Sequence, residues 1–277
     1  MQSMKKNREV VTILTYGALC IGAVIMIFPF IWMLLTAFKT NAEVMQIPPT
    51  ILPSAWKMDS FTKAMDLLPF GKLYLNTILM IIARVICAVA FCSMAGYAFA
   101  KLDFKGKNFL FTLIIIQQMI PGQIFIIPQY QMIAKLGATN TLFALVFPGI
   151  VSAFGTFFLR QAYLGIPNEV AEAAYLDGCN RWQTFTKVMF PLTSSSVAAL
   201  TVFTAVFAYT DLMWPLIVNT NINATTLSAG LSSLNGQFST NYPVLMAGSL
   251  LAMLPMVVLY LIFQRQFIEG VAMTGGK

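Results

Sequence analysis

The sequence predicts an all-α integral membrane protein with six transmembrane helices and both termini in the cytoplasm. Three observations predict this fold class. Only 10% of the residues are charged and 58% are hydrophobic, whereas a soluble domain normally has about 25% charged residues. Long apolar runs recur along the chain, and Lys and Arg gather in alternate connecting segments. The composition therefore fits a chain whose solvent is lipid.

Each expected span is long enough to cross about 30 Å of hydrocarbon at roughly 1.5 Å per residue. The spans cover 11–38, 73–100, 109–134, 142–162, 194–218 and 243–264. The basic start before the first span is like that of a signal peptide. The apolar run is too long for one, however, and no small-residue cleavage site follows it. We therefore expect a retained first helix and a single transmembrane domain over 1–277.

The distribution of positive charge predicts the orientation. Most of the 17 basic residues lie at the N-terminus, in the loops after the second and fourth spans, and in the tail. They are Lys5, Lys6, Arg8, Lys101, Lys105, Lys107, Arg160, Arg181, Lys187, Arg265 and Lys277. Because cytoplasmic loops are enriched in Lys and Arg, both termini are predicted to be cytoplasmic.

Several kinds of chemistry lack their usual residues. The chain has no His, which is the commonest general base and metal ligand. Its four cysteines have no paired spacing, and the sequence contains no glycine-rich phosphate loop followed by Lys. The net charge of +7 is dispersed, unlike a nucleic-acid-binding surface. We expect no catalytic site, no cofactor or metal bound by this chain, and no nucleic-acid partner.

Two loops are predicted on the outer side. The loop 39–72 is the longest, and its Trp56, Phe61 and Phe70 fit either an aromatic belt at the membrane interface or a contact with an external partner. The loop 219–242 has no charge and is rich in Asn, Ser, Thr and Gly. Both loops are therefore expected to face water or a partner.

Polar and helix-breaking residues inside the spans are candidates for function, because lipid cannot satisfy them. The third span contains Gln117, Gln118, Gln123 and Gln129 among Pro121, Gly122 and Pro128. Proline frees backbone carbonyls, and amides bond both carbonyls and sugar hydroxyls. This pattern predicts a span that lines a translocation path. Amides that only bond neighbouring helices are the structural alternative.

Four further residues are tentative members of the path, namely Asn76, Arg84, Tyr209 and Asp211. Arg84 lies mid-span and is expected either to pair internally or to face the cavity. Asp211 lies near the outer end of the fifth span. It fits an interfacial carboxylate reached by water, or a group in the cavity that bonds substrate hydroxyls or holds a broken helix end.

The stretch 169–192 is an amphipathic interruption on the predicted cytoplasmic side. We interpret it as two short helices, the first capped by Asn168 and ended by Gly178 in the left-handed conformation. Asn180 and Gln183 fit a capping box for the second helix. Its apolar stripe is formed by Trp182, Phe185 and Met189. Two helices that simply lie on the membrane surface are the plainer interpretation.

The same stretch resembles the EAA loop of ABC importer permeases, which has Glu-Ala-Ala, then Asp-Gly, a downstream Phe and Pro-Leu. The matching residues are Glu172, Ala173, Ala174, Asp177, Gly178, Phe185, Pro191 and Leu192. Other segments resemble the carbohydrate-uptake, MalG-like branch, namely 157–161, 166–167, 208–215 and 263–270. In 208–215, Tyr209 and Thr210 replace the Trp and Asn that are usual in sugar permeases. The resemblance covers nearly the whole chain.

This resemblance implies a non-catalytic membrane subunit of a sugar importer, with an oligosaccharide as the expected carbohydrate. It implies a MalF-like permease partner, two ATPase subunits that hold ATP and Mg, and an extracytoplasmic solute-binding protein, all at a bacterial cytoplasmic (inner) membrane. The loop 163–192 would couple to the ATPase through Glu169, Glu172, Ala173, Ala174, Asp177, Gly178 and Arg181. Val170, Ala173 and Ala174 fall on one helix face, where small side chains predict close approach of another protein.

An ion-coupled secondary transporter of a small polar solute is the alternative function. Such transporters use internal repeats and ion-binding groups near the bilayer midplane. The sequence shows no convincing repeat, and Asp211 is its one clear intramembrane carboxylate. A membrane-embedded enzyme ranks third, because no nucleophile motif or carboxylate pair supports chemistry. Dependence on ATP or on an ion gradient distinguishes the first two functions.

Overall fold

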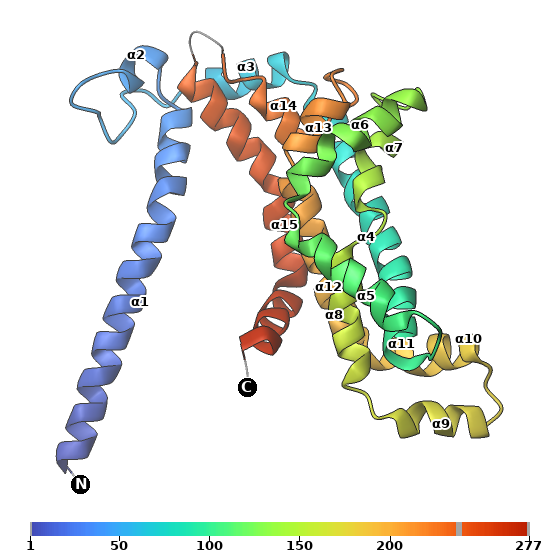
Figure 1. Cartoon of the computed structure of the whole chain (residues 1–277). Coiled ribbons are helices and arrows are strands. Elements are labelled where there is room, and N and C mark those ends of the chain that lie inside the picture. Colours follow the sequence, from blue (N-terminus) through green and yellow to red (C-terminus); the bar gives the residue numbers. More distant parts are fainter. Residues whose placement is uncertain (1, 237–239, 276–277) are drawn as a thin grey trace. The chain divides into compact units, whose positions relative to one another are not determined.

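The computed structural model describes residues 2–236 and 240–275, and this part of the chain contains helices and no strand (Figure 1). The predicted all-α class is confirmed. The chain divides into two compact units. One consists of Met1–Leu68 with Ser233–Met253, and the other of Pro69–Ser232 with Leu254–Lys277.

The first unit contains the long apolar helix α1 (Gln2–Ala37), which covers the first expected span. Two short helices follow, α2 (Asn41–Val44) and α3 (Asp59–Leu67). The last helix, α15 (Tyr242–Gly275), also begins in this unit and covers the sixth expected span. The first and sixth apolar segments are therefore single helices of sufficient length to cross a membrane.

The segment after α1 folds around the Glu43 carboxylate. Thr40 and Glu43 cap α2 reciprocally, with N–H to oxygen distances of 3.3 and 3.4 Å. The Ser54 N–H donates to the other Glu43 oxygen at 2.7 Å. Phe38 packs against Trp56, with ring centroids 5.1 Å apart. Glu43 therefore fastens the far end of this loop to its beginning.

Acidification is expected to loosen this loop. The Ser54 N–H bond is the main cause that holds the pKa of Glu43 below its ordinary value of 4.5, with Thr40 and Lys39 acting in the same direction. Because the pKa of the folded state is the lower one, the stabilisation is complete above about pH 4.5 and is lost as the pH falls through the folded-state pKa. Hydrogen–deuterium exchange of residues 40–54, corrected for its intrinsic pH dependence, should rise in that acid range.

Glu43→Ala should raise the same exchange already at neutral pH, because it removes both carboxylate acceptors. Protection that is equal in the variant and the parent at pH 7 would show that Glu43 does not hold the loop.

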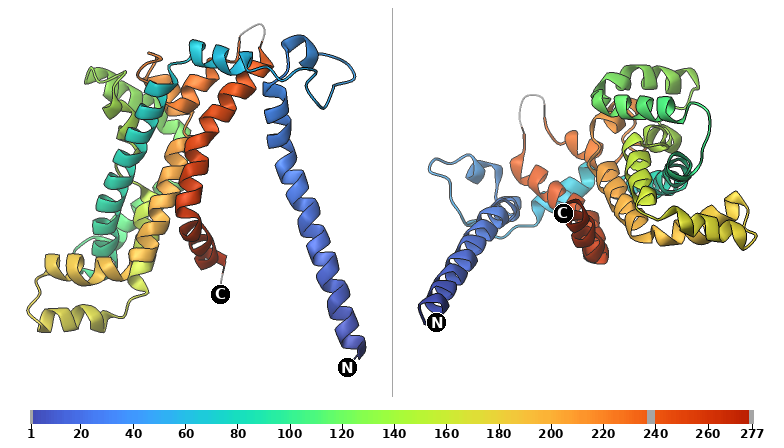
Figure 2. Two further views of the ribbon diagram at one scale, coloured as in Figure 1. Left: turned by 180° about the vertical axis from the view of Figure 1, so that it is seen from behind. Right: turned by 60° about the horizontal axis from the view of Figure 1, so that its bottom comes forward.

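The second unit contains the remaining helices, and α4 runs through its whole length (Figures 1 and 2). In chain order these are α4 (Phe70–Lys101), α5 (Lys107–Met119), the 3-10 turn Gly122–Phe125, α6 (Ile126–Lys135), α7 (Leu142–Val146), the 3-10 turn Phe147–Gly149, α8 (Ala153–Leu164), α9 (Asn168–Leu176), α10 (Arg181–Gln183), the π-helical turn Thr184–Met189, α11 (Phe190–Leu192), α12 (Ser194–Thr210), α13 (Met213–Val218) and α14 (Leu227–Ser232).

Helix α4 packs against α8 and α12, and small residues permit the close approach. A Cβ atom built on Gly96 would lie 2.9 Å from the backbone nitrogen of Arg160. One built on Gly155 would lie 2.9 Å from the sulfur of Cys92. The buried core around these crossings includes Ala88, Tyr97, Leu159, Tyr163 and Leu200. The three helices therefore form one closely packed body.

Several of the expected spans are broken rather than continuous. Three helices of the described chain are long and apolar enough to cross a membrane, or up to six spans if each bent pair counts as one. The pair Lys107–Met119 and Gly122–Lys135 bends by 100°. Pro121 lies at this bend and has no N–H with which to continue α5. The helix-breaking residues expected within 109–134 thus coincide with a sharp bend, while the count of six spans and the orientation stay predictions.

Candidate translocation path and coupling loop

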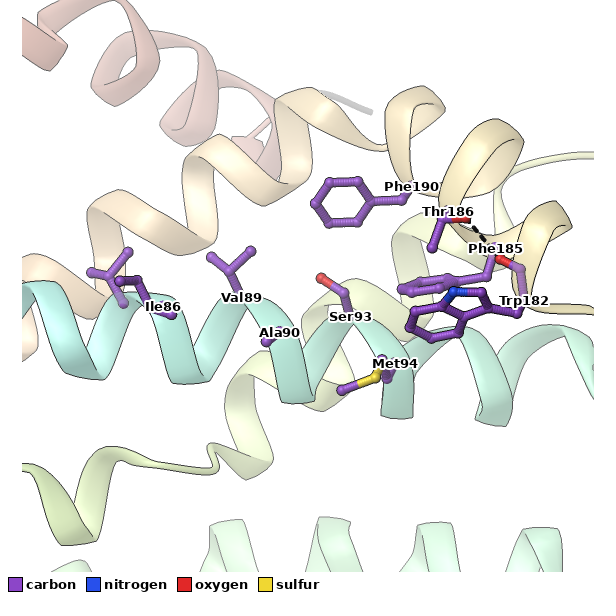
Figure 3. Close-up of a pocket in the computed structure, with 10 residues that line it drawn as sticks. Ile86, Val89, Ala90, Ser93, Met94, Trp182, Phe185, Thr186 and Phe190 are labelled. Carbon is purple, nitrogen blue, oxygen red and sulfur yellow. Dashed lines mark hydrogen bonds between the residues drawn. The ribbon is translucent and has the colours of Figure 1, made fainter.

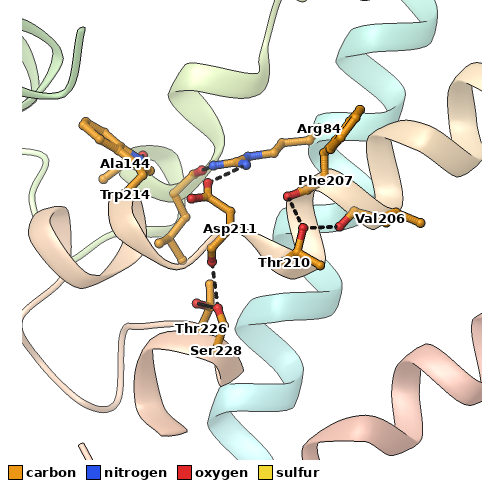
Figure 4. A network of polar contacts seen from close by, with 10 residues as sticks. Arg84, Ala144, Val206, Phe207, Thr210, Asp211, Trp214, Thr226 and Ser228 are labelled. Atoms are coloured by element: carbon orange, nitrogen blue, oxygen red, sulfur yellow. Dashed lines mark hydrogen bonds and ion pairs between the residues drawn. The ribbon is translucent and has the colours of Figure 1, made fainter. Parts of the chain in front are cut away.

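An ion pair between Arg84 and Asp211 forms the polar centre of the second unit (Figure 4). Arg84 lies on α4, and Asp211 lies in the break between α12 and α13. Arg84 Nη1 and Asp211 Oδ2 are 2.9 Å apart, and the side chains are 8% and 22% exposed. The Arg84 Nε also donates to the Leu145 carbonyl of α7 at 3.0 Å. Through the ion pair and this hydrogen bond, Arg84 connects the continuous helix α4 to the break between α12 and α13 and to α7.

The surroundings of the pair are built to hold it. The Ser228 hydroxyl donates to the Asp211 backbone carbonyl at 2.7 Å, which satisfies a group released by the end of α12 (Figure 4). A Cβ atom built on Gly149 would lie 2.5 Å from Arg84 Cδ, so only glycine leaves room for this arginine side chain. Arg84 is therefore paired internally, as one of the two expectations for it had it, and Asp211 lies at a broken helix end.

Two cavities, of about 340 and 500 Å³, flank the ion pair. Arg84 lines the smaller cavity and Asp211 lines the larger one. Gln117 and Pro148 line both cavities, which places the cavities next to each other. Further amides from the broken third span line one or the other, namely Gln118, Gln123 and Gln129. The fold therefore gathers most of the tentative path residues around one polar centre.

The other two tentative residues line neither cavity. Asn76 donates its side-chain N–H groups to the carbonyls of Asn223 and Thr225, at 3.0 Å each, and so supports the loop 219–242. Tyr209 lies on α12, on the turn that precedes the break. A direct part for either residue in the path stays a prediction. Sequence reasoning missed Pro148 of the cavity wall, which an adjacent Pro and Gly inside an apolar segment could have revealed.

The first helix of the loop 163–192, α9, begins and ends at defined positions. Pro167 is its N-cap, so the expectation that Asn168 caps it is wrong. The Asn168 side chain instead accepts a hydrogen bond from Lys101 Nζ at 2.7 Å. Gly178 has φ +85°, and the following Cys179 N–H donates to the Ala174 carbonyl at 2.9 Å. The predicted left-handed glycine after the helix is confirmed.

The second helix, α10, is anchored to the spans. Asn180 and Gln183 form the predicted capping box, with both bonds 2.9 Å long. Phe185, in the π-helical turn, is buried against Tyr97 of α4 and Tyr163 of α8, with ring centroids 5.2 and 6.5 Å apart. The segment Arg181–Leu192 meets α12 at an angle of 77°. The apolar side chains of this segment therefore hold it against α4 and α8, next to the point where it joins α12.

An apolar groove of about 660 Å³ lies between α4 and this segment (Figure 3). Trp182, Phe185 and Phe190 form one wall, and Val89 and Met94 are on the other (Figure 3). The lining is almost entirely apolar, and Ser93 and Thr186 are its hydroxyl-bearing residues. The groove therefore suits lipid or an apolar protein surface rather than a polar solute.

The exposed face of α9 differs in part from the predicted one. Ala174 is 6% exposed and packs inward, so the expectation that it shares an open face with Ala173 is wrong. The reason is helix phase, because Ala171 and Ala174 are three residues apart and both face the core. The open stripe has helical spacing and consists of Glu169, Glu172, Ala173 and Leu176. Asp177, Gly178 and Arg181 are exposed beside it.

Sequence reasoning missed Leu176 in this stripe. It is 88% exposed, although it lies at the end of a well-formed helix on a stripe with two carboxylates. A lone leucine between the Glu-Ala-Ala and Asp-Gly residues was the available signal. Leu176 is the most exposed large apolar side chain of α9, which makes it a candidate point of contact with another protein.

Comparison with known proteins identifies the family. The model of the binding-protein-dependent transport system inner membrane component family matches residues 90–272. The chain belongs to this family. It is therefore a membrane permease with several apolar helices, as the resemblance of residues 169–192 implied.

Relatives of this permease are known over nearly its whole length. The arabinooligosaccharides transport system permease protein of Halalkalibacterium halodurans is 36% identical over 92% of each chain. The sn-glycerol-3-phosphate transport system permease protein of Salmonella typhi is 29% identical over 96% of this chain and 98% of the relative. The crystal structure of a bacterial ABC transporter involved in the import of the acidic polysaccharide alginate contains a chain with the same fold. The TM-score is 0.78 at 21% identity, covering 93% of this permease and 96% of that chain.

Proposed function

We propose that this permease is one of two membrane subunits of an ATP-driven, binding-protein-dependent sugar importer. The observation that carries the proposal is the construction of the cytoplasmic loop. Its open stripe, from Glu169 to Leu176, stands on a helix whose partner segment is fastened by Phe185 to α4 and α8. A movement of the stripe would therefore be transmitted to α4 and α8, because no flexible linker would absorb it.

The ATPase is the partner that this stripe fits. Apolar Leu176 would enter a pocket of the ATPase, while Glu169 and Glu172 would make polar contacts at the rim. Closure of two ATPase subunits would move α9 as a rigid body about Gly178. The motion would tilt α8 and α12, whose ends carry the loop. Because α12 ends at Asp211, the tilt would act on the polar centre between the cavities.

The solute is expected to be a sugar, and an oligosaccharide in particular. The cavity walls offer amides from Gln117, Gln118 and Gln123, which bond sugar hydroxyls as donors and as acceptors. By their names, the two relatives belong to transport systems for arabinooligosaccharides and for sn-glycerol-3-phosphate. ATP and Mg would be held by the separate ATPase, so this subunit itself would be non-catalytic.

The expected assembly contains this chain, a homologous MalF-like permease, two ATPase subunits and an extracytoplasmic solute-binding protein. It would lie in a bacterial cytoplasmic membrane, with both termini and the loop 163–192 on the cytoplasmic side.

Purification of the tagged chain from native membranes in a gentle detergent tests this proposal. Mass spectrometry should identify a second permease and an ATPase with a phosphate-binding loop. The recovered assembly, placed in liposomes with its binding protein, should take up oligosaccharide only when ATP is supplied. Recovery of the chain alone, with uptake that a proton or sodium gradient drives, would instead support the ion-coupled alternative.

A further inference from the structure

The two cavities around the polar centre are balanced in charge. Among the described residues that line them, Arg84 is the one cationic side chain and Asp211 the one anionic side chain. Each is the ion-pair partner of the other, at 2.9 Å. The other polar groups of the walls are neutral, such as Gln117 and Thr204. The walls therefore offer hydrogen bonds to a solute but no unpaired charge.

Arg84 would be a strong anion site if its partner were removed. Its guanidinium is fixed by the Leu145 carbonyl, and the missing side chain of Gly149 leaves room for its stem. The side chain is 8% exposed, so water screens its charge poorly. A planar guanidinium held in this way binds carboxylate or phosphate through two parallel hydrogen bonds. Asp211 now occupies that position with one of its own oxygens.

We propose that Asp211 is a specificity-determining residue that keeps the path neutral by occupying Arg84, so that the path takes uncharged oligosaccharides. An anionic sugar would have to displace the Asp211 carboxylate from Arg84 and leave it unpaired between the cavities. A neutral sugar makes its bonds to the amides without disturbing the pair. This inference rests on the proposed import function and names the class of sugar.

The test uses the assembled transporter with Asp211→Asn, which keeps the side-chain shape and removes the charge. The thermal-unfolding midpoint of the assembly in detergent is measured against increasing digalacturonate, with a neutral disaccharide at matched ionic strength as reference. Asp211→Asn should respond to digalacturonate at concentrations at least about tenfold lower than the parent does, because a charge-assisted bond becomes available. The double variant Arg84→Gln with Asp211→Asn should lose this response again.

A second variant guards against a folding defect in Asp211→Asn. Gly149→Ala places a methyl group 2.5 Å from Arg84 Cδ, which is too close, and so displaces the arginine while both charges remain. It should also acquire a response to digalacturonate. If Asp211→Asn responds like the parent, or if the double variant keeps the response, the inference is overturned. ATP-driven uptake of digalacturonate by the parent in liposomes would also overturn it.

Failure of the import function itself would look different. The parent assembly would then take up no sugar with ATP, while the detergent titrations would still report whether Asp211 shields Arg84 from anions.

Discussion

Replacing Leu176 with Asp is expected to stop ATP-driven uptake while leaving the chain folded in the membrane. Leu176 is 88% exposed, so the substitution removes almost no contact within the chain. If Leu176 is the apolar anchor in the ATPase, the lost contact corresponds to about 2 kcal/mol, or roughly thirtyfold weaker binding. The introduced carboxylate adds to Glu169 and Glu172 on the same stripe, which increases the loss further.

The measurement is the amount of ATPase that co-purifies with the tagged permease, followed by uptake in liposomes. Leu176→Met should keep most of the ATPase recovery and most of the uptake, because it preserves an apolar side chain of similar volume. Leu136→Asp is the matched control, since Leu136 is also an exposed leucine at the end of a short helix, α6. Full ATPase recovery with Leu176→Asp, or equal loss with Leu136→Asp, would remove Leu176 from the interface.

The local features of the loop 163–192 could be predicted from the sequence because each depends on a few neighbouring residues. Gly178 follows a short helical pattern, and a left-handed residue there is the usual way to end a helix. The side chains of Asn180 and Gln183 accept hydrogen bonds from each other's backbone N–H groups across one helical turn. Their spacing in the sequence is therefore enough to predict the capping box. The orientation of Ala174 could not be predicted in the same way. It depends on which side of α9 faces the core, and that is set by contacts with residues distant in the sequence, such as the turn Thr184–Met189.

The polar centre shows the same division between local and distant information. Arg84 and Asp211 were each recognised separately as candidates for function, because a charged side chain inside a membrane span needs a partner. That they are partners of each other depends on the bend that ends α12 and on the route of α4 past it. Proline and glycine marked the third span as irregular, but they do not give the size of the bend, which is 100°. Neither the pairing of Arg84 with Asp211 nor the angle of this bend can be predicted from the residues of a single segment.

Replacing Gly96 with Leu is expected to prevent α4 and α8 from packing. A Cβ atom at this position would lie 2.9 Å from the Arg160 backbone nitrogen and 3.1 Å from the Leu159 carbonyl carbon. Backbone atoms in the middle of a helix cannot move aside, so the two helices must separate, and the rest of the leucine side chain adds to the displacement. We expect a loss of stability of about 3 kcal/mol.

Gly71→Leu on the same helix is the matched control, because a Cβ atom there meets no atom within 4 Å. Thermal unfolding of the detergent-purified chain should show a lowered midpoint for Gly96→Leu and little change for Gly71→Leu. Helix α8 leads into α9, and α12 follows α11. The packing of α4 against α8 and α12 therefore also positions both ends of the loop 163–192. Gly96→Leu should therefore lose ATPase recovery together with stability, whereas Leu176→Asp should lose ATPase recovery alone. Equal midpoints for Gly96→Leu and Gly71→Leu would mean that α4 and α8 are not in close contact in the membrane.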